Sequence, residues 1–286
     1  MAIFRKENRI NVYQDTIECI KAGMVTGSTS KTPYELGLQK TLSGTRFYQK
    51  VKKTDENYEW QDTVMYAQVI DCIQKAYEFG EDGALLNMAS RFRAGGGVVN
   101  GSASQEEEIF RRTTLGYSLY FLDPGAQVEY EYPGKHPKIP GYPFKGDRAA
   151  IWSPDVVIFK KGPNGYYDYM GTPGITNVIT IPAVQHPELT ENGTEFKEKP
   201  ARMWRNKIRS LLRVAKEHGK KKLVLGAFGC GAYGNPPELV ARYFKEIFNE
   251  PEFKGYFTEV CFAILEDKNS PKDGNYAPFA KVFGHK

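Results

Sequence analysis

The sequence lacks several features that would assign it quickly to a class of protein. No run of roughly 18 or more apolar residues occurs, so no segment is long enough to span a membrane as a helix. The first residues, MAIFRKENR, lack the apolar core of a signal peptide. The four cysteines stand far apart, at positions 19, 72, 230 and 261, with no CxxC pair. We therefore expect a reducing, cytoplasmic compartment, with neither a dense disulfide framework nor a zinc site.

Signatures of metal and nucleotide chemistry are also missing. The four histidines, at 136, 186, 218 and 285, do not form HExxH or another ligand spacing, so we expect no catalytic metal and no cofactor. GxxxxGK[ST] is absent, and we do not interpret either glycine-rich loop, GCGAYG included, as the dinucleotide-binding fingerprint, so hydride transfer and NTP hydrolysis are poorly supported. The net charge of +5 is compatible with an anionic ligand but does not by itself indicate nucleic-acid binding.

What is present is enough apolar sequence for a large core, arranged as alternating strands and helices. The chain has 286 residues, of which 41% are hydrophobic and 13% aromatic. Apolar, β-branched runs predict strands, and amphipathic runs predict helices. This alternation predicts an α/β fold in which helices cover both faces of a sheet. The predicted strands are 84–90, 155–160, 177–183, 221–228 and 258–266, and the predicted helices are 105–120, 198–218 and one that Asn235 caps, with Pro236 as its first residue.

The N-terminal segment, 1–80, has a helical pattern. Helices are predicted at 10–22, within 32–43 and at 63–79, the last with Thr63 as a possible N-cap. No linker separates this part from the rest, so we expect a single domain over residues 1–286, in which residues 1–80 form a helical N-terminal extension packed on the core. An irregular segment at 122–150 is rich in Pro, Gly and Tyr and holds one candidate strand, QVEYEY.

Two of the predicted strands run into glycine-rich loops. ALLNMAS is followed by RFRAGGGVV, and LVLGAF is followed by GCGAYGNPP. Glycine lets backbone N–H groups approach phosphate oxygens, and a following helix N-terminus adds favourable partial charge. Ligands of open α/β sheets bind beyond the carboxyl ends of strands, so two such loops could clamp a diphosphate. The alternative is that each loop only connects a strand to a helix and binds no ligand.

Three glutamates, at 106, 107 and 108, follow the first loop. Because Ser104 precedes Glu107 by three residues, a capping box that starts a helix is one interpretation. The other is chemical, since a carboxylate beside a phosphate-binding loop would lie near the attached sugar. Glycosidic cleavage needs a group that protonates the leaving oxygen and then activates water. Neighbouring carboxylates and a bound diphosphate raise a carboxyl pKa, whereas the helix dipole lowers it.

The combination of these motifs resembles a known family. GGG, seven residues and then QEE resembles the catalytic signature of bacterial-type poly(ADP-ribose) glycohydrolases, and GAFGCGAYGNPP resembles their second diphosphate-binding loop. Similarity continues through ALLNMAS, WSPDVVIFK, VITIPAV and CFAILED, and so covers roughly residues 80–267. The resemblance implies a macrodomain-like, three-layer α/β/α fold with a mixed central sheet and with ADP-ribose lying across the strand ends.

The resemblance also implies a reaction and a set of site residues. The reaction would be hydrolysis of ribose–ribose O-glycosidic bonds in poly(ADP-ribose), exo-acting and releasing ADP-ribose, by a monomer that needs no metal. Glu107 would be the general acid and base, Glu106 would hold ribose hydroxyls, and Gln105 would position the pair. Tyr233 would lie against the terminal ribose. The implied backbone contacts to the diphosphate are Gly96, Gly97 and Val98 on one side and Gly229, Cys230, Gly231 and Ala232 on the other.

Three positions depart from the family pattern, and none removes a catalytic group. Ala94 stands where proline is frequent, Tyr233 stands where phenylalanine is common, and Glu108 is an additional acid that we expect to face solvent. Two alternatives keep the fold: a hydrolase of mono-ADP-ribosylated protein or nucleic acid, and a non-catalytic ADP-ribose-binding macrodomain. The partners expected are poly(ADP-ribose) or ADP-ribosylated macromolecules, with ADP-ribose as the product ligand and no membrane.

Other candidate residues have two interpretations each. Asn87 ends a strand on the predicted ligand side, where it could bond a ribose hydroxyl or merely end the strand. Cys230 precedes a helix, a position that can lower a thiol pKa, but a role as a small loop residue is favoured. The tyrosines between 117 and 142 could stack on adenine, although packing is the commoner role of such aromatics.

Overall fold

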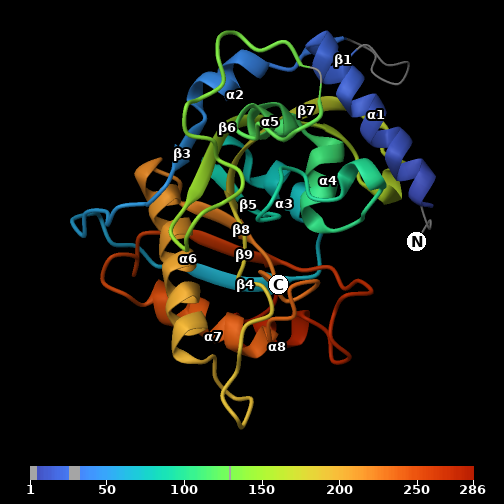
Figure 1. The fold of residues 1–286 in the computed structure, drawn as a ribbon. Coiled ribbons are helices and arrows are strands. Elements are labelled where there is room, and N and C mark those ends of the chain that lie inside the picture. The colour runs from blue at the N-terminus through green and yellow to red at the C-terminus, as the bar shows by residue number, and fades with distance from the viewer. Residues whose placement is uncertain (1–4, 26–32, 129) are drawn as a thin grey trace.

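The centre of the structure is a seven-stranded mixed sheet with helices on both faces, as the sequence predicts (Figure 1). This computed structural model describes residues 5–25, 33–128 and 130–286. Five adjacent strands, β7, β5, β8, β9 and β4, run parallel, whereas β6 is antiparallel to both neighbours. Across the sheet the order is β3 (Arg46–Tyr48), β6 (Ala150–Lys160), β7 (Tyr169–Ile181), β5 (Gly83–Met88), β8 (Lys222–Leu225), β9 (Glu259–Ala263) and β4 (Val64–Gln68).

The helices form the two outer layers (Figure 1). One face carries α3 (Cys72–Phe79), α4 (Gln105–Arg112) and α5 (Leu115–Phe121), with α1 (Lys6–Ala22) packed against α4. The other face carries α6 (Glu198–Glu217), α7 (Pro237–Phe248) and α8 (Tyr276–Phe283). None of the helices in the described ranges is long and apolar enough to cross a membrane. The smaller elements are α2 (Leu38–Gly44), the strand pair β1 (Met24–Val25) and β2 (Tyr34–Glu35), and the 3₁₀ turns Gly80–Asp82, Val98–Asn100 and Pro163–Gly165.

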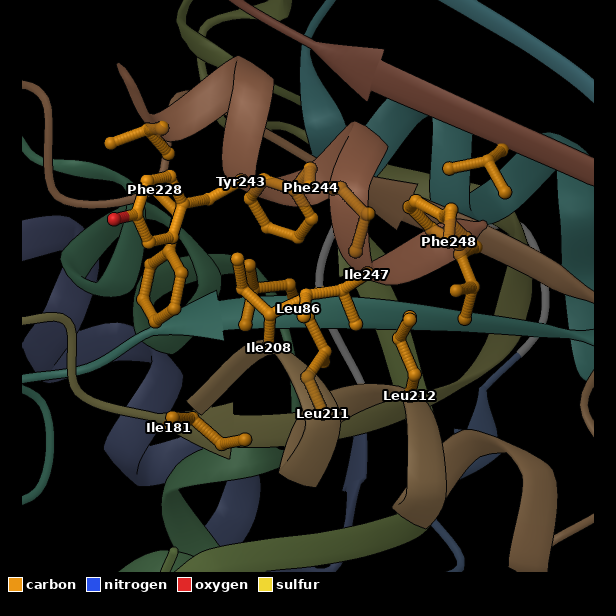
Figure 2. Close-up of a cluster of buried hydrophobic side chains, with 14 of the residues drawn as sticks. Leu86, Ile181, Ile208, Leu211, Leu212, Phe228, Tyr243, Phe244, Ile247 and Phe248 are labelled. Atoms are coloured by element: carbon orange, nitrogen blue, oxygen red, sulfur yellow. The ribbon is translucent and has the colours of Figure 1, made fainter. Parts of the chain in front are cut away.

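The apolar face predicted for the helix at 198–218 is buried. Trp204, Ile208, Leu211, Leu212 and Ala215 are all fully buried against the sheet, because residues spaced three and four apart share one side of a helix. Figure 2 shows how α6 and α7 interleave their side chains over β5 and β7. The labelled members of this core are Leu86, Ile181, Ile208, Leu211, Leu212, Phe228, Tyr243, Phe244, Ile247 and Phe248.

The helix predicted at 63–79 is wrong in its first half. Residues 64–68 form the edge strand β4, which pairs in parallel with β9, and the helix α3 begins only at Cys72. Its N-cap is Asp71, whose Oδ1 accepts a hydrogen bond from Gln74 N at 2.8 Å, and not Thr63. The open edge of β9 offers backbone partners that a helical periodicity in the sequence cannot reveal, so tertiary pairing decides the local structure.

The helix predicted at 105–120 is broken between α4 and α5. Thr113 bridges to Ile158, and Thr114 exchanges hydrogen bonds with Val157, whose N–H binds Thr114 Oγ1 at 2.9 Å and whose carbonyl accepts from Thr114 N at 3.0 Å. These contacts with β6 replace the helical bonds at the break. The candidate strand QVEYEY is also wrong for the residues described, since 127, 128 and 130–132 are irregular. Tyr130 and Tyr132 instead pack on the ring of Tyr117.

Two predictions near the C-terminal half need correction. Helix α7 begins at Pro237 with Pro236 as its N-cap, so Asn235 does not cap it. The side chain of Asn235 turns into the core and bonds other segments, as described below. Helix α8, which packs on α7 and β4, was not predicted.

The N-terminal segment, 1–80, is not a purely helical extension. Its described residues contribute β3 and β4, which are the two opposite edges of the main sheet. The helix predicted at 10–22 is present as α1, and the one predicted within 32–43 is present from Leu38, while residue 32 lies outside the described residues. The segment before β5 is therefore part of the sheet that carries the rest of the fold.

Candidate active site

A large cavity opens at the carboxyl ends of the parallel strands. Its volume is about 1190 Å³, and we refer to it as the first cavity. Residues that follow each of the five parallel strands line it: Ile70 after β4, Met88 at the end of β5, Ala183 after β7, Ala227 after β8 and Ile264 after β9. Parallel strands bring all these ends to one edge of the sheet, where ligands of such folds bind.

The first glycine loop forms one wall of the first cavity. Gly96 has a φ of +53°, and an added Cβ would lie only 2.7 Å from Glu107 Oε1 and 3.0 Å from Glu106 Oε2. Gly95 has a φ of +74°, and its Cβ would meet the ring of Phe110 at 2.7 Å. Both positions need glycine, because a side chain would be strained and would collide with its neighbours. The loop is thus fitted closely around the two carboxyl groups.

The two glutamates after this loop point back to it from the first turn of α4. Glu106 accepts hydrogen bonds from Ser90 N at 2.7 Å and from Gly95 N at 3.2 Å. Glu107 Oε1 accepts one from Gly97 N at 2.9 Å. The other oxygen, Glu107 Oε2, is buried and has no hydrogen-bond partner among the described residues. A carboxyl group with one oxygen fixed and the other unpaired at a cavity wall is available to a ligand.

The capping box that the sequence suggests does not form. Ser104 is the N-cap of α4, but its side chain makes no capping bond, and Glu107 bonds Gly97 instead of reaching back to Ser104. The glutamate at this position therefore serves the cavity and not the helix start. Glu108 does not face solvent as predicted: its side chain is only 16% exposed, and its Oε1 accepts from Arg111 Nη2 at 2.7 Å and from Tyr167 OH at 2.8 Å.

Gln105 fixes the start of α4 to the end of β5. Its Nε2 donates to the Leu86 carbonyl at 2.6 Å, and its Oε1 accepts from Met88 N at 2.9 Å. This pair of bonds holds the glutamates that follow at a fixed height above the strand. Gln105 thus lies where a residue that positions Glu106 and Glu107 should lie.

Burial controls the protonation of Glu106. It is the largest of the effects that together raise the pKa of Glu106 from its ordinary value of 4.5 to about 8; the nearby Glu107 adds to the rise, while the Ser90 and Gly95 N–H groups oppose it. Near neutral pH the Glu106 carboxyl therefore retains its proton, next to Glu107.

The second glycine loop, Gly229–Tyr233, forms the opposite wall. Gly229, Gly231, Ala232 and Tyr233 all line the first cavity. Within the described residues, the N–H groups of Gly231 and Ala232 have no acceptor, whereas Cys230 N and Asn235 N close turns within the loop. Gly96 N, on the other wall, is likewise without an acceptor in the described chain. Unpaired N–H groups on both sides of a cavity suit an anion such as a diphosphate.

Asn235 supports the second loop from behind. Its Nδ2 donates to the Val184 carbonyl at 2.7 Å and to the Gly229 carbonyl at 2.8 Å, and its Oδ1 accepts from Trp204 Nε1 at 2.9 Å. One buried side chain thus joins the end of β7, the loop and α6. The sequence signal for this residue was its place after the loop, but its role as a helix cap was the wrong interpretation.

The structure brings most of the predicted site residues together. Nine of the twelve line the first cavity: Gly96, Gly97, Gln105, Glu106, Glu107, Gly229, Gly231, Ala232 and Tyr233.

Three of the predicted residues do not line it. Asn87 is fully buried within β5 and donates to Thr180 Oγ1 at 3.3 Å. The Val98 N–H, which was predicted to face the diphosphate, is taken by the Gly95 carbonyl at 2.9 Å. The Cys230 side chain is buried in the core, and this burial raises its thiol pKa well above the ordinary value, which disfavours a thiolate.

Some cavity residues were missed, and one group of aromatics lies elsewhere. Phe92 and Tyr167 line the first cavity, as does Asp71, whose Oδ2 accepts from Arg112 Nη1 at 2.7 Å. Nothing in the local sequence marks them, since they come together only through the fold.

The tyrosines between 117 and 142 do not line this cavity, and Tyr117, Tyr120, Tyr130 and Tyr132 pack on one another.

Comparison with known families identifies the family to which this fold belongs. The family model described as "Microbial-type PARG, catalytic domain", where PARG is poly(ADP-ribose) glycohydrolase, matches residues 13–161, which is more than half of the chain. This chain belongs to the microbial-type PARG catalytic-domain family. The PARG match includes the first glycine loop and the three glutamates of α4. The expected class of enzyme, a hydrolase of the glycosidic bonds of poly(ADP-ribose), is thereby confirmed.

Solved PARG structures extend the similarity over the whole fold. PARG from Thermomonospora curvata is 24% identical, with a TM-score of 0.77, over 97% of this chain and 100% of that chain. The T. curvata enzyme bound to the inhibitor ADP-HPD is 23% identical over 96% and 99% of the two chains, with a TM-score of 0.72. PARG from Deinococcus radiodurans in complex with ADP-ribose is 25% identical over 86% and 96%, with a TM-score of 0.65. No curated protein sequence gives a significant match.

Proposed function

We propose that Glu107 is the general acid and base that cleaves the ribose–ribose bond of poly(ADP-ribose). The observation that carries this proposal is the pairing of its two oxygens: Oε1 is held by Gly97 N, while Oε2 is buried at the cavity wall without a partner in the described chain. Glu107 would protonate the 2′-oxygen of the leaving ribose as the C1″–O2′ bond breaks. It would then take a proton from the water whose oxygen bonds C1″.

Glu106 and the two glycine loops would position the substrate. Glu106 would hold hydroxyls of the ribose that is cleaved, and its raised pKa would keep its own carboxyl protonated at neutral pH. The free N–H groups of Gly96, Gly231 and Ala232 would bind the diphosphate, and the ring of Tyr233 would lie against the terminal ribose. Gly97 and Val98 are left out of this set, because their N–H groups already bond Glu107 Oε1 and the Gly95 carbonyl.

The mode of action and the setting remain proposals that follow from the family resemblance and the fold. We propose that the chain acts from polymer ends, as a monomeric cytoplasmic enzyme on poly(ADP-ribose) attached to macromolecules. Four unpaired cysteines support a reducing compartment. We also propose one domain over residues 1–286, supported by the two edge strands that lie before β5 in the chain.

The test of the catalytic proposal is the substitution Glu107→Gln. Glutamine can keep the bond from Gly97 N but cannot give or take the proton, so release of ADP-ribose from poly(ADP-ribose) should fall by about 100- to 10,000-fold. Binding of ADP-ribose, followed by calorimetry, should persist. The measurement is ADP-ribose release over time, with chain length followed in parallel, because an exo-acting enzyme yields monomer from the outset.

The matched control is Glu238→Gln. Glu238 also lies in the first turn of a helix, α7, but it is exposed and does not line the first cavity, so activity should stay near wild type. A Glu107→Gln variant as active as wild type would contradict the assignment. If wild type releases ADP-ribose only from mono-ADP-ribosylated protein, the substrate is the single adduct and not the polymer. If it binds ADP-ribose tightly but forms no product from either, the chain is a binding module.

A further inference from the structure

A second cavity adjoins the first at the end of β7. Its volume is about 730 Å³. Ala183 and Gln185 line both cavities, so the two are neighbours along the same edge of the sheet. From there the second cavity extends over residues 186–190 to the start of α6, where Lys197 and Lys199 lie at its rim.

Lys207 is the unusual member of this lining. This residue of helix α6 is only 4% exposed, yet among the described residues its ammonium makes no hydrogen bond, ion pair or ring contact. Burial, followed by the positive charge of Arg91, lowers the pKa of Lys207 to about 8, while Asp147 opposes them. The ammonium of this largely buried side chain is thus desolvated, unpaired and at a cavity wall, so an anion bound in the cavity would stabilise it.

The charges around Lys207 favour an anion. Four cationic side chains line the second cavity, against two carboxylates, one of which, Glu188, is paired with Lys197 at 3.0 Å. An excess of two positive charges therefore faces the cavity, with His186 as a further titratable group. Asp147, the nearby acid, accepts a hydrogen bond from Asn206 at 2.8 Å and forms no ion pair with Lys207. The cations are Arg91, Lys197, Lys199 and Lys207, and the carboxylates are Glu188 and Glu198.

The second cavity is also joined to the segment that binds Glu106. Ser90, whose N–H binds Glu106, is followed directly by Arg91, which lines the second cavity. Along the sheet edge, the first cavity runs from β4 to β7, and the second continues beyond β7. In poly(ADP-ribose) the leaving oxygen belongs to the ribose of the next unit, and that same ribose carries the next diphosphate. A dianion must therefore lie within a few bonds of the cleaved position.

We propose that the second cavity binds the diphosphate of the ADP-ribose unit that leaves, with Lys207 and Arg91 as its cationic partners. This subsite rests on the function proposed above, because it adds a second contact to the same substrate. This subsite would favour the polymer over a single ADP-ribose that carries an uncharged group at C1″, because only the polymer has a second diphosphate to bind there. Charge-assisted contacts to phosphate are strong, and a partly desolvated ammonium strengthens them further.

The test compares two substrates in wild type and in Lys207→Met. One is poly(ADP-ribose), and the other is ADP-ribose linked at C1″ to 4-nitrophenol, whose leaving group carries no phosphate. The ratio of kcat/KM for the polymer to kcat/KM for the aryl compound should fall about tenfold in Lys207→Met, as expected for one lost phosphate contact. Polymer cleavage by the variant should also depend less steeply on salt concentration.

The control is Arg202→Met, which removes a cation from an exposed position of the same helix outside both cavities and should leave the ratio unchanged. If Lys207→Met does not fold, Arg91→Met at the exposed rim tests the same subsite. An unchanged ratio in the folded variant would overturn the subsite while leaving the catalytic proposal intact. Wild type that cleaves neither substrate would overturn the proposed function itself, and the subsite with it.

Discussion

At the residue scale, the most consequential group is the buried carboxyl of Glu106. Its pKa is raised to about 8 in the folded chain, whereas a glutamate in an unfolded chain titrates near 4.3. The folded state therefore binds this proton more tightly than the unfolded state does. Between these two values the unfolded state has lost the proton and the folded state has kept it, so stability falls as pH rises through this window and levels off above pH 8.

The substitution Glu106→Gln tests this account. Glutamine stays neutral, so the variant escapes the loss of stability that wild type suffers between about pH 4 and pH 8. Relative to wild type, its free energy of unfolding should increase by a few kcal/mol on going from pH 5 to pH 9, as for a pKa displaced by several units. Urea unfolding at the two pH values measures it. Any pH-independent loss of a hydrogen bond to Ser90 or Gly95 cancels in this comparison.

The matched control for this measurement is Glu238→Gln on α7. Glu238 is exposed, so its removal should shift stability equally at both pH values. If Glu106→Gln behaved in the same way as Glu238→Gln, burial would not be holding a proton on Glu106.

At the scale of elements, the two walls of the first cavity are held by different means. The first loop is held by the glutamates themselves and by Gln105, which joins α4 to β5. The second loop is held by Asn235, which joins β7, α6 and the loop. The width of the cavity between the loops therefore depends on a small set of side-chain hydrogen bonds.

The change Asn235→Asp removes this support without changing the size of the side chain. A carboxylate cannot donate to the Val184 and Gly229 carbonyls, so the Val184 carbonyl loses its partner and the Gly229 carbonyl keeps only the backbone N–H of residue 235, at 3.1 Å. We expect a loss of about 2–4 kcal/mol in the free energy of unfolding, together with weaker ADP-ribose binding. Urea unfolding and calorimetric titration give the two quantities.

The control is Asn249→Asp at the exposed C-cap of α7, where Nδ2 donates only to the Lys245 carbonyl. There the change should alter stability by no more than about 1 kcal/mol and should leave ADP-ribose affinity unaltered. Equal effects of the two substitutions would show that Asn235 has no special part in holding the second loop.

The elements that the sequence predicted are those with a strong local pattern. Strands β5 and β8 are apolar runs, and α6 has five apolar residues on one face, so burial follows directly from the order of residues. The elements that were missed depend on partners distant in the chain. Strand β4 forms because β9 offers an open edge, and the break between α4 and α5 forms because Thr113 and Thr114 bond β6.

The same distinction applies to the site. The glycines and the glutamates could be found because their spacing is local and their chemistry is specific. The capping box suggested for Ser104 and Glu107 was an equally local pattern. It does not form, because Gly97 N binds the Glu107 carboxylate instead. Asn235 and Lys207 could not be found in this way, since each owes its role to segments distant in the chain or to a cavity that only the fold creates.

At the scale of the whole molecule, the site depends on both halves of the chain. The family model matches residues 13–161, which include Glu106 and Glu107, but the second loop and most of the second cavity come from residues beyond this range. The sheet has the same character. Its two edges, β3 and β4, precede β5 in the chain, whereas β8 and β9, beside the second loop, come from the last third.

This arrangement predicts that a fragment of residues 81–286 will not fold as a unit. Without β4, strand β9 keeps only β8 as a partner and becomes an open edge, and the buried side chains of Tyr66, Ala67, Ile73 and Ala76 no longer cover the sheet. An exposed apolar edge favours association over folding. Calorimetry and circular dichroism should find one cooperative transition for the full chain and none for the fragment. A fragment that unfolds cooperatively and binds ADP-ribose would show that residues 1–80 are not needed for a stable, folded domain. That result would also mean that residues 81–286 form the binding site without β3 and β4. The position of these two strands at the edges of the sheet leads us to expect the opposite.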